Sequence, residues 1–294
     1  MVRSMYAAVA GLRAHQSKMD VIGNNIANVN TYGYKSARAT FQDSIYQTTR
    51  GASDATATYG GMNPSQVGYG STVASIDLIF GTSSYAPTGK ATDCMIDGNG
   101  FFLVGQLGKE IDIEEQTELK SLQVSRVGNF FFDGNGNLVD HNGQSVYGFV
   151  PPDAGGAIVY DKLGSIKIPK DAAGKPLELG SITIDSSGMI TGIDDKEQIV
   201  VIGQIALANV PNPSALEKSQ GPYYRMVANT GTITANKPTE GSTGKLITNG
   251  LEMANVDLAN EFSEMITTQR GFQANGKIIT VTDEMLQELI NLKR

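Results

Sequence analysis

Two short patterns in the sequence hold residue types that could bind a cofactor or a metal ion, and each lacks a part that the chemistry requires. Gly98-Asn-Gly100 begins like a dinucleotide-binding turn, but position 103 is Leu where a third glycine is needed. Residues 133–137 resemble the start of a calcium loop, yet Leu138 stands where that loop requires Gly, and no Glu closes it. We interpret the second pattern as a hairpin turn.

The residues that most often perform nucleophilic or metal chemistry are scarce. The chain has one cysteine and two histidines, His15 in a helical pattern and His141 in a Gly/Asn turn. A catalytic triad would need these distant segments to meet by coincidence. Cys94 lies in an apolar strand pattern, which favours a buried, unreactive thiol. We therefore predict no catalytic residue, no cofactor and no metal site, so the chain is not an enzyme.

Composition excludes further classes of protein and locates the elements. The 294 residues carry a formal net charge of -7, which disfavours nucleic-acid binding. Charged residues interrupt residues 1–29, so we expect this segment to be neither a cleaved secretory signal nor a membrane span. No proline precedes Pro64 or follows Pro238. Because proline breaks helices, this distribution predicts a helix at each end and a turn-rich centre.

Both ends carry an apolar stripe of helical period. We predict a terminal helical domain from residues 1–30 and 251–294, in which two long helices pair in a coiled-coil-like manner and complete their burial against other subunits. The alternative is that both helices only pack on a sheet of their own domain. The proposed assembly interface comprises Leu12, Met19, Ile22, Ile26, Leu258, Phe262, Met265, Phe272, Ile279 and Leu286.

The centre shows strand patterns and the connections show turn chemistry. Short β-branched or alternating runs separated by Asp-Gly turns predict a central antiparallel all-β domain over residues 71–228, and hence an α+β fold. Residues 31–70 and 229–250 are rich in Gly, Ser, Thr and Asn and are expected to be extended connectors. We expect side-chain to backbone hydrogen bonds to form the exit of the first helix, at Asn24, Asn25, Asn28, Asn30 and Gly33.

Three motifs, in order along nearly the whole chain, resemble the signatures of bacterial flagellar rod and hook proteins. The N-terminal signature includes residues 4–13 and the run that ends in Thr31-Tyr-Gly-Tyr-Lys35. The central strand Asp97-Gly-Asn-Gly-Phe-Phe102 resembles a second signature. Residues 251–266 with Thr268-Gln-Arg-Gly-Phe-Gln-Ala-Asn275 resemble the third, C-terminal one.

The resemblance implies a structural axial subunit that self-assembles into a helical tube, with the terminal helices inside and the β domain outside. It also implies export by the flagellar type III apparatus without a cleaved signal peptide, and contact with neighbouring axial proteins of the rod, hook cap and hook–filament junction. The protein would then be extracellular, in the hook and basal body, with no nucleic acid bound and no membrane insertion. The motifs look most like a short flagellar hook subunit, which transmits motor torque as a flexible joint; a distal rod subunit is the alternative.

Two other classes of function stay open from the residues alone. A secreted β-rich enzyme or carbohydrate-binding module would be a folded monomer complete without its ends, and an adhesin or surface-layer subunit would form a lattice on the envelope. Trimming about 30 residues from the N-terminus and about 40 from the C-terminus separates them, because an axial subunit would become a soluble monomer.

Overall fold

The computed structural model describes residues 2–55, 60–113, 115–151, 158, 160–169, 176–177, 179–194 and 198–292. The chain has an α+β fold with N- and C-terminal helices and a central antiparallel β-sheet domain, as predicted. It divides into two compact units. The terminal unit comprises Met1–Val29, Ser36–Ile79 and Val256–Arg294, and the β unit comprises Asn30–Lys35 and Phe80–Asn255.

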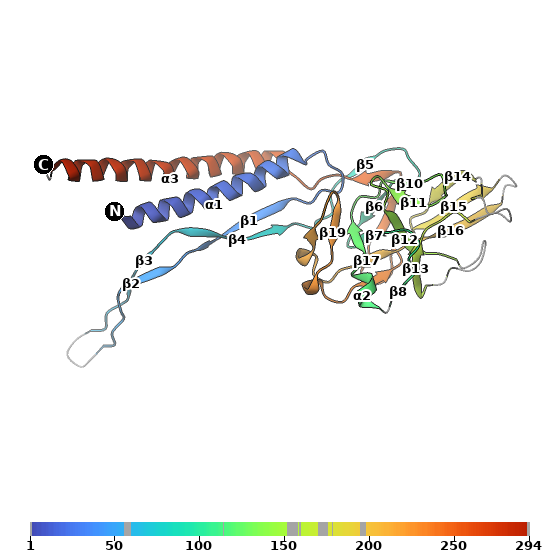
Figure 1. Ribbon diagram of the computed structural model, residues 1–294, viewed down its shortest axis with the longest axis horizontal. Helices are drawn as coiled ribbons and strands as arrows, with labels where there is room; N and C mark the ends of the chain where they lie inside the picture. The colour runs from blue at the N-terminus through green and yellow to red at the C-terminus, as the bar shows by residue number, and fades with distance from the viewer. Residues whose placement is uncertain are drawn as a thin grey trace. The chain divides into compact units, whose positions relative to one another are not determined.

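Two long helices form the frame of the terminal unit. Helix α1 spans Val2–Ala27, and α3 spans Leu258–Leu292 (Figure 1). Asp257 caps α3, because its carboxylate oxygen Oδ1 accepts hydrogen bonds from the backbone N–H groups of Ala259 (2.9 Å) and Asn260 (3.3 Å). The expected C-terminal helical domain began at residue 251; instead, Gly250–Glu252 form strand β22, and the helix starts after this cap.

The segment expected as an N-terminal connector instead forms a long β ribbon in the terminal unit. Strand β1 (Ala37–Asp43) pairs antiparallel with β4 (Ser71–Leu78), and β2 (Tyr46–Arg50) pairs with β3 (Ser65–Gly68). In Figure 1 the β1–β4 ribbon runs beside α1, and both strands contact that helix. In each of these two pairs the strands satisfy each other's backbone N–H and C=O groups, which an isolated extended connector could not do. The predicted central domain includes β4, whereas the strand belongs to the terminal unit.

The β unit holds the remaining strands. The segment 229–250, also expected as a connector, contributes two of them, β20 and β21. Helix α2 (Gln116–Leu119) and the 3₁₀ turns η1 (Pro213–Ala215) and η2 (Ala228–Thr230) lie between strands. The first strands are β5 (Tyr85–Pro87), β6 (Cys94–Asp97), β7 (Phe101–Gly105), β8 (Ile111–Asp112), β9 (Gln123–Ser125), β10 (Phe130–Phe132), β11 (Leu138–Asp140), β12 (Ser145–Phe149) and β13 (Lys162–Ser165). The later strands are β14 (Leu179–Ile184), β15 (Met189–Asp194), β16 (Ile199–Ile205), β17 (Leu207–Asn209), β18 (Glu217–Lys218), β19 (Tyr223–Arg225), β20 (Thr234–Asn236), β21 (Lys245–Thr248) and β22 (Gly250–Glu252).

A continuous antiparallel sheet organises this unit. Its main path runs β14-β15-β16-β12-β7-β9-β19-β18, and two smaller pairs, β21 with β6 and β22 with β5, join distant parts of the chain. Phe102 on β7 packs edge-to-face on Phe130 at 5.1 Å between ring centroids, inside the buried core. Cys94 is fully buried in this core, as predicted, and burial raises the pKa of its thiol.

Candidate functional site on the terminal helices

Helices α1 and α3 lie side by side and run antiparallel. The amide nitrogen Nδ2 of Asn25 donates a hydrogen bond to Oε1 of Glu261 at 2.9 Å. Further along, a Cβ atom added to Gly271 would lie 2.7 Å from the ring of His15, and one added to Gly11 would lie 2.7 Å from the Asn275 amide. Each step toward the start of α1 is therefore a step toward the end of α3.

Small and polar residues lie at several of the contacts between the two helices. Gly271 leaves room for the imidazole of His15. This imidazole also packs edge-to-face on the ring of Phe41 on β1, with 5.8 Å between the ring centroids. Thr268 and Thr282 are the buried residues of α3 among the part of the helix whose side chains are described. Gly11 and Gly271 leave room for the side chains of Asn275 and His15, so polar groups contribute to this contact.

The predicted interface residues divide into two groups by exposure. Ile22 is buried; half-buried are Leu12, Met19 and Ile26 on α1 and Met265, Ile279 and Leu286 on α3. The other three, Leu258, Phe262 and Phe272, are 40%, 50% and 37% exposed. Three large side chains of the predicted seam thus remain available to another molecule.

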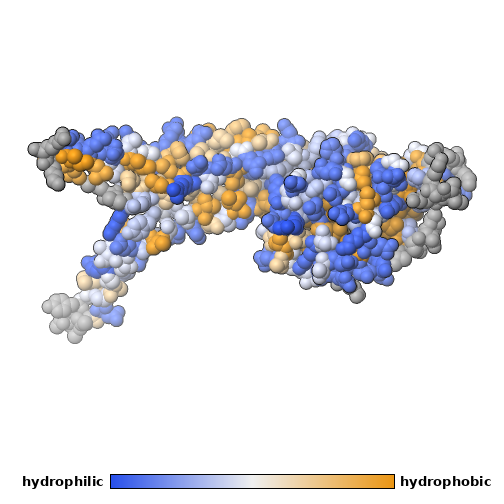
Figure 2. All heavy atoms as spheres, in the orientation of Figure 1, coloured by the Kyte–Doolittle hydropathy of each residue, from blue (hydrophilic) through white to orange (hydrophobic). Residues whose placement is uncertain are grey.

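Helix α3 carries two rows of exposed apolar side chains. The first row follows a spacing of four residues and consists of Leu258, Phe262 and Ile266. The second row follows spacings of three and four and consists of Ile278, Val281, Met285, Leu289 and Leu292. At 100° per residue the midlines of the rows are turned by about 140° around the helix axis. Figure 2 shows hydrophobic side chains at the surface of the terminal helices.

The exit of α1 is fastened by asparagine amides. The Asn25 side chain donates to the carbonyl of Ala37 (2.9 Å) and accepts from its N–H (3.0 Å), so it pairs with the start of β1 as another strand would. Nδ2 of Asn28 donates to both oxygens of Asn24, the carbonyl at 2.9 Å and Oδ1 at 2.7 Å. The Asn30 side chain is exposed.

Gly33 lies in the following turn and belongs to the β unit. Its φ is +67°, a left-handed conformation that other residues adopt at a cost. A Cβ atom at this position would lie 2.7 Å from a methyl carbon of Val127. Its N–H donates to the carbonyl of Glu252 at 2.8 Å. Both the backbone conformation and the close approach therefore require glycine here.

A buried cluster of charges, which the sequence analysis missed, lies in the β unit. Nζ of Lys35 is 2.7 Å from Oε1 of Glu252, and Nε of Arg126 is 3.3 Å from Oε2 of the same carboxylate. The side chains of the three residues are 0%, 0% and 3% exposed. Burial lowers the pKa of Lys35 and of Arg126, and the Glu252 carboxylate opposes both shifts. Lys35 and Glu252 both lie in motifs already noted, but nothing in their spacing indicated a pair.

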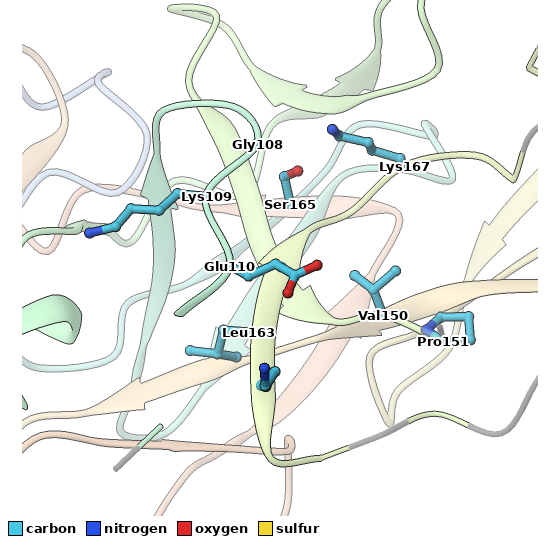
Figure 3. Close-up of a pocket in the computed structure, with 10 residues that line it drawn as sticks. Gly108, Lys109, Glu110, Val150, Pro151, Leu163, Ser165 and Lys167 are labelled. Carbon is cyan, nitrogen blue, oxygen red and sulfur yellow. The ribbon is translucent and has the colours of Figure 1, made fainter. Parts of the chain in front are cut away.

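The depression of about 410 Å³ shown in Figure 3 is a poor candidate for a catalytic or ligand site. Its lining includes Lys109 and Lys162, but each lies near a carboxylate, on Glu118 (3.4 Å) and on Asp112 (3.7 Å). In the figure Lys109 and Lys167 do not converge on the carboxylate of Glu110. Across the described ranges, no group of three or more His, Cys, Asp or Glu side chains could hold a metal ion.

The candidate site is therefore the exposed apolar surface of α3, which is suited to contact with another protein rather than to catalysis. Three family descriptions match the chain: "Flagella basal body rod protein" over residues 5–35, "Flagellar hook protein FlgE/F/G D1 domain" over 95–192, and "Flagellar basal body rod FlgEFG protein C-terminal" over 248–292. The chain belongs to the flagellar rod and hook protein family, as the sequence motifs predicted.

Several relatives, all from bacteria, resemble the chain over its full length. Flagellar basal-body rod protein FlgG of Bacillus subtilis is 43% identical over 295 residues, and its counterpart in Borreliella burgdorferi is 32% identical over 297. Flagellar hook protein FlgE of Borreliella burgdorferi is 29% identical over 453 residues. Each alignment covers all of both proteins.

These families and relatives are structural flagellar proteins, so the chain is a flagellar axial structural protein and not an enzyme. Within the described part of the chain, no helix combines the length and apolar character needed to cross a membrane.

Proposed function

We propose that this protein is a subunit of the flagellar basal-body rod and that it polymerises through its terminal helices. The observation that carries the proposal is the pair of exposed apolar rows on α3. Side chains such as Phe262 and Leu289 would be removed from water by a neighbouring helix, and each buried methylene group contributes about 0.8 kcal/mol.

The position of the two rows favours an open polymer over a closed dimer. A two-fold dimer uses one patch that meets a copy of itself, whereas a filament uses two different patches that meet in head-to-tail contacts. Rows turned by about 140° around one helix can contact two different neighbours. In this arrangement Leu258 and Phe262 contact one copy and Phe272 is a further exposed assembly residue outside both rows, while Met265, Ile279 and Leu286 contribute mainly to the α1–α3 pair.

The alignments with relatives support a rod subunit over the hook subunit favoured by the motifs. The two rod proteins align with it over 295 and 297 residues, hardly more than its own 294. The hook protein aligns over 453 residues, more than half again the length of this chain. The alignment with the hook protein therefore contains long gaps within the given sequence, whereas the alignments with the rod proteins contain almost none. A short hook subunit is the second candidate.

The same proposal supplies the partners and the location. Copies of the chain and neighbouring axial proteins would cover the terminal helices, and the flagellar type III export apparatus would carry the chain out of the cell without a cleaved signal peptide. Mass spectrometry of the protein recovered from flagella tests the second point, since it reads whether the N-terminus begins at the residues printed here.

Electron microscopy of the polymer, purified from cells or assembled in vitro, tests the main proposal. A straight, rigid tube is the expected result, and a curved tube would identify a hook subunit instead. A chain that stays monomeric at every concentration would contradict both. Gln273→Asp is the matched control for substitutions in the apolar rows, because it changes an exposed polar residue of the same helix.

A further inference from the structure

The chain passes between its two units four times, and three of these passages meet at the buried charges of the β unit. Lys35 is the last residue of Asn30–Lys35, and the unit resumes at Phe80 and ends at Asn255. Nζ of Lys35 donates to Oε1 of Glu252 (2.7 Å) and to the carbonyl of Gly81 (2.6 Å). The same carboxylate oxygen accepts from the N–H of Ser83 at 3.0 Å.

Backbone hydrogen bonds join the same three segments. The carbonyl of Ser84 accepts from the N–H of Met253 at 3.0 Å, and the hydroxyl of Ser83 donates to the carbonyl of Ala254 at 2.8 Å. The N–H of Gly33 donates to the carbonyl of Glu252 at 2.8 Å. These hydrogen bonds therefore connect the three segments into one network, with the Glu252 carboxylate near its centre.

Arg126 connects this hydrogen-bond network to the central sheet. Its Nη1 donates to the carbonyl of Gly100 (2.7 Å) and its Nη2 to the carbonyl of Gly98 (2.9 Å), in the turn between β6 and β7. Strand β7 lies in the middle of the sheet path and is buried over most of its length. Through Arg126, the Glu252 carboxylate is thus connected to the turn that precedes this core strand.

We propose that Lys35, Glu252 and Arg126 form a junction latch, which holds the chain passages of the β unit in one fixed geometry. Buried ion pairs seldom add net stability compared with apolar residues, but breaking one by removing a single partner is strongly destabilising. The latch therefore resists separation of the passages more than it stabilises the unit. This role rests on the proposed function, in which force enters the β unit through these covalent passages. The three residues would contribute to torque transfer by holding these chain passages in position.

The charges in the latch predict an order among variants. Two cations share one carboxylate, so Lys35→Met leaves a neutral Arg126–Glu252 pair, whereas Glu252→Gln leaves two buried cations without a counter-charge. Lys35→Met should therefore be the milder change. The double variant Lys35→Met/Glu252→Gln keeps one cation on two carbonyl groups and should be less damaged than Glu252→Gln alone. Glu217→Gln is the control, because it breaks an exposed ion pair of the same unit, 2.6 Å long.

Amide hydrogen exchange of the full chain tests the latch independently of flagellar assembly. In Lys35→Met, exchange at Gly33, Ser83 and Met253 should rise at least about tenfold, while exchange in β7 stays unchanged. The proposal would be overturned by a rise of the same size in β7, or by unchanged exchange at Gly33, Ser83 and Met253. If Glu252→Gln does not fold, recovery of a folded protein in the double variant supports the predicted order, and failure of the double variant to fold contradicts it.

Motility in media of increasing viscosity tests torque transfer in cells that carry each variant as their sole copy. Cells with Lys35→Met should assemble flagella but lose speed at a lower viscosity than cells with Glu217→Gln. Equal swimming speeds of the Lys35→Met and Glu217→Gln cells at every viscosity would show that the latch has no role in torque transfer. If the unaltered chain fails to restore motility to cells lacking their own copy, the proposed function fails, while the exchange result still decides whether the latch exists.

Discussion

Asn25 shows how much of the fold one side chain can hold. Its amide bonds to both backbone groups of Ala37 and to the Glu261 carboxylate, so it joins α1 to β1 and to α3 within the terminal unit. It is almost fully buried. Burial raises the pKa of Glu261, and the hydrogen bond from Asn25 opposes that rise.

Asn25→Asp should destabilise the helix pair by about 2–3 kcal/mol at neutral pH, because the new carboxylate cannot donate and would face Glu261. Repulsion raises the pKa of one carboxyl in the folded variant above its unfolded value. The penalty should therefore shrink as pH falls toward about 4, where that carboxyl is protonated. Thermal melts followed by far-ultraviolet circular dichroism across this pH range give the measurement.

Asn24→Asp serves as the control for this substitution. Oδ1 of Asn24 accepts a hydrogen bond from Asn28, and an aspartate oxygen accepts it equally well. Its stability should stay within about 0.5 kcal/mol of the unaltered protein. A penalty for Asn25→Asp that is independent of pH would contradict the proposed repulsion.

The contact of Gly271 with His15 should set the register of α1 against α3. Gly271→Ala would place a methyl group 2.7 Å from the imidazole, whereas Gly276→Ala would meet nothing within 4 Å. Alanine in a helix is favoured over glycine by about 1 kcal/mol, so Gly276→Ala should stabilise the helix. Gly271→Ala should be less stable than Gly276→Ala by about 1–3 kcal/mol.

Shortening His15 distinguishes steric conflict from other causes. In a His15→Ala background the stabilities of the Gly271→Ala and Gly276→Ala variants should become nearly equal, because the group that met the new methyl is gone. The helical transition in urea gives each stability. A difference that persists in this background would show that the close approach to His15 does not explain it.

At the scale of single elements, the exposed rows of α3 carry the assembly prediction. Phe262→Asp should abolish polymerisation and leave the secondary structure of the monomer unchanged, because half of the Phe262 side chain is already in water. Phe272→Asp should have the same effect on assembly, with an additional loss of packing from its more buried ring. Sedimentation separates polymer from monomer, with circular dichroism as the check on folding. A Phe262→Asp protein that sediments like the unaltered chain would refute the role of the first row.

The helices could be predicted from periodicity, but their contact faces could not. The same spacing of three and four places Met265 in a half-buried position and Phe262 in an exposed one, since both a helix pair and a subunit interface select apolar residues. Gly271, which lies against His15 of α1, and the buried Thr268 are absent from an apolar stripe. Hydrophobicity alone therefore identifies the two helices, but it does not predict which residues of α1 lie opposite which residues of α3.

The β ribbon and the latch were hidden for different physical reasons. Strands β1, β2 and β3 of the ribbon are polar and largely exposed, so they lack the alternating apolar pattern that reveals a half-buried strand. Strand β4 alternates in burial and lies within the region predicted to be β, but its pairing partner β1 could not be recognised. The latch joins Lys35 and Glu252 across 217 residues of sequence. Only the pairing of distant segments brings such residues together, and no local rule indicates it.

At the scale of the whole molecule, buried tyrosines in the β unit predict its response to alkaline pH. Burial raises the pKa of Tyr224 to about 12 from an ordinary value of 10.0. Burial also raises the pKa of Tyr223, which donates a 2.5 Å hydrogen bond to Asp140, and that of Tyr147. Lys35 acts in the opposite direction, because its lowered pKa makes stability rise with pH until the unfolded lysine also loses its proton.

Above pH 10 the unfolded chain loses tyrosine protons that the folded chain keeps, so stability should fall as pH rises through the folded pKa of about 12. Tyr224 alone accounts for about 3 kcal/mol of this loss, at 1.36 kcal/mol per pKa unit. Tyr224→Phe keeps the ring that packs on Phe80 at 5.4 Å and removes the proton, so the alkaline midpoint of unfolding should move to higher pH. Tyr32→Phe, at an exposed site, should leave the midpoint in place. The midpoint is read from circular dichroism, alongside tyrosinate absorbance. If Tyr224→Phe and the unaltered protein unfold at the same pH, the buried hydroxyl of Tyr224 does not control alkaline stability.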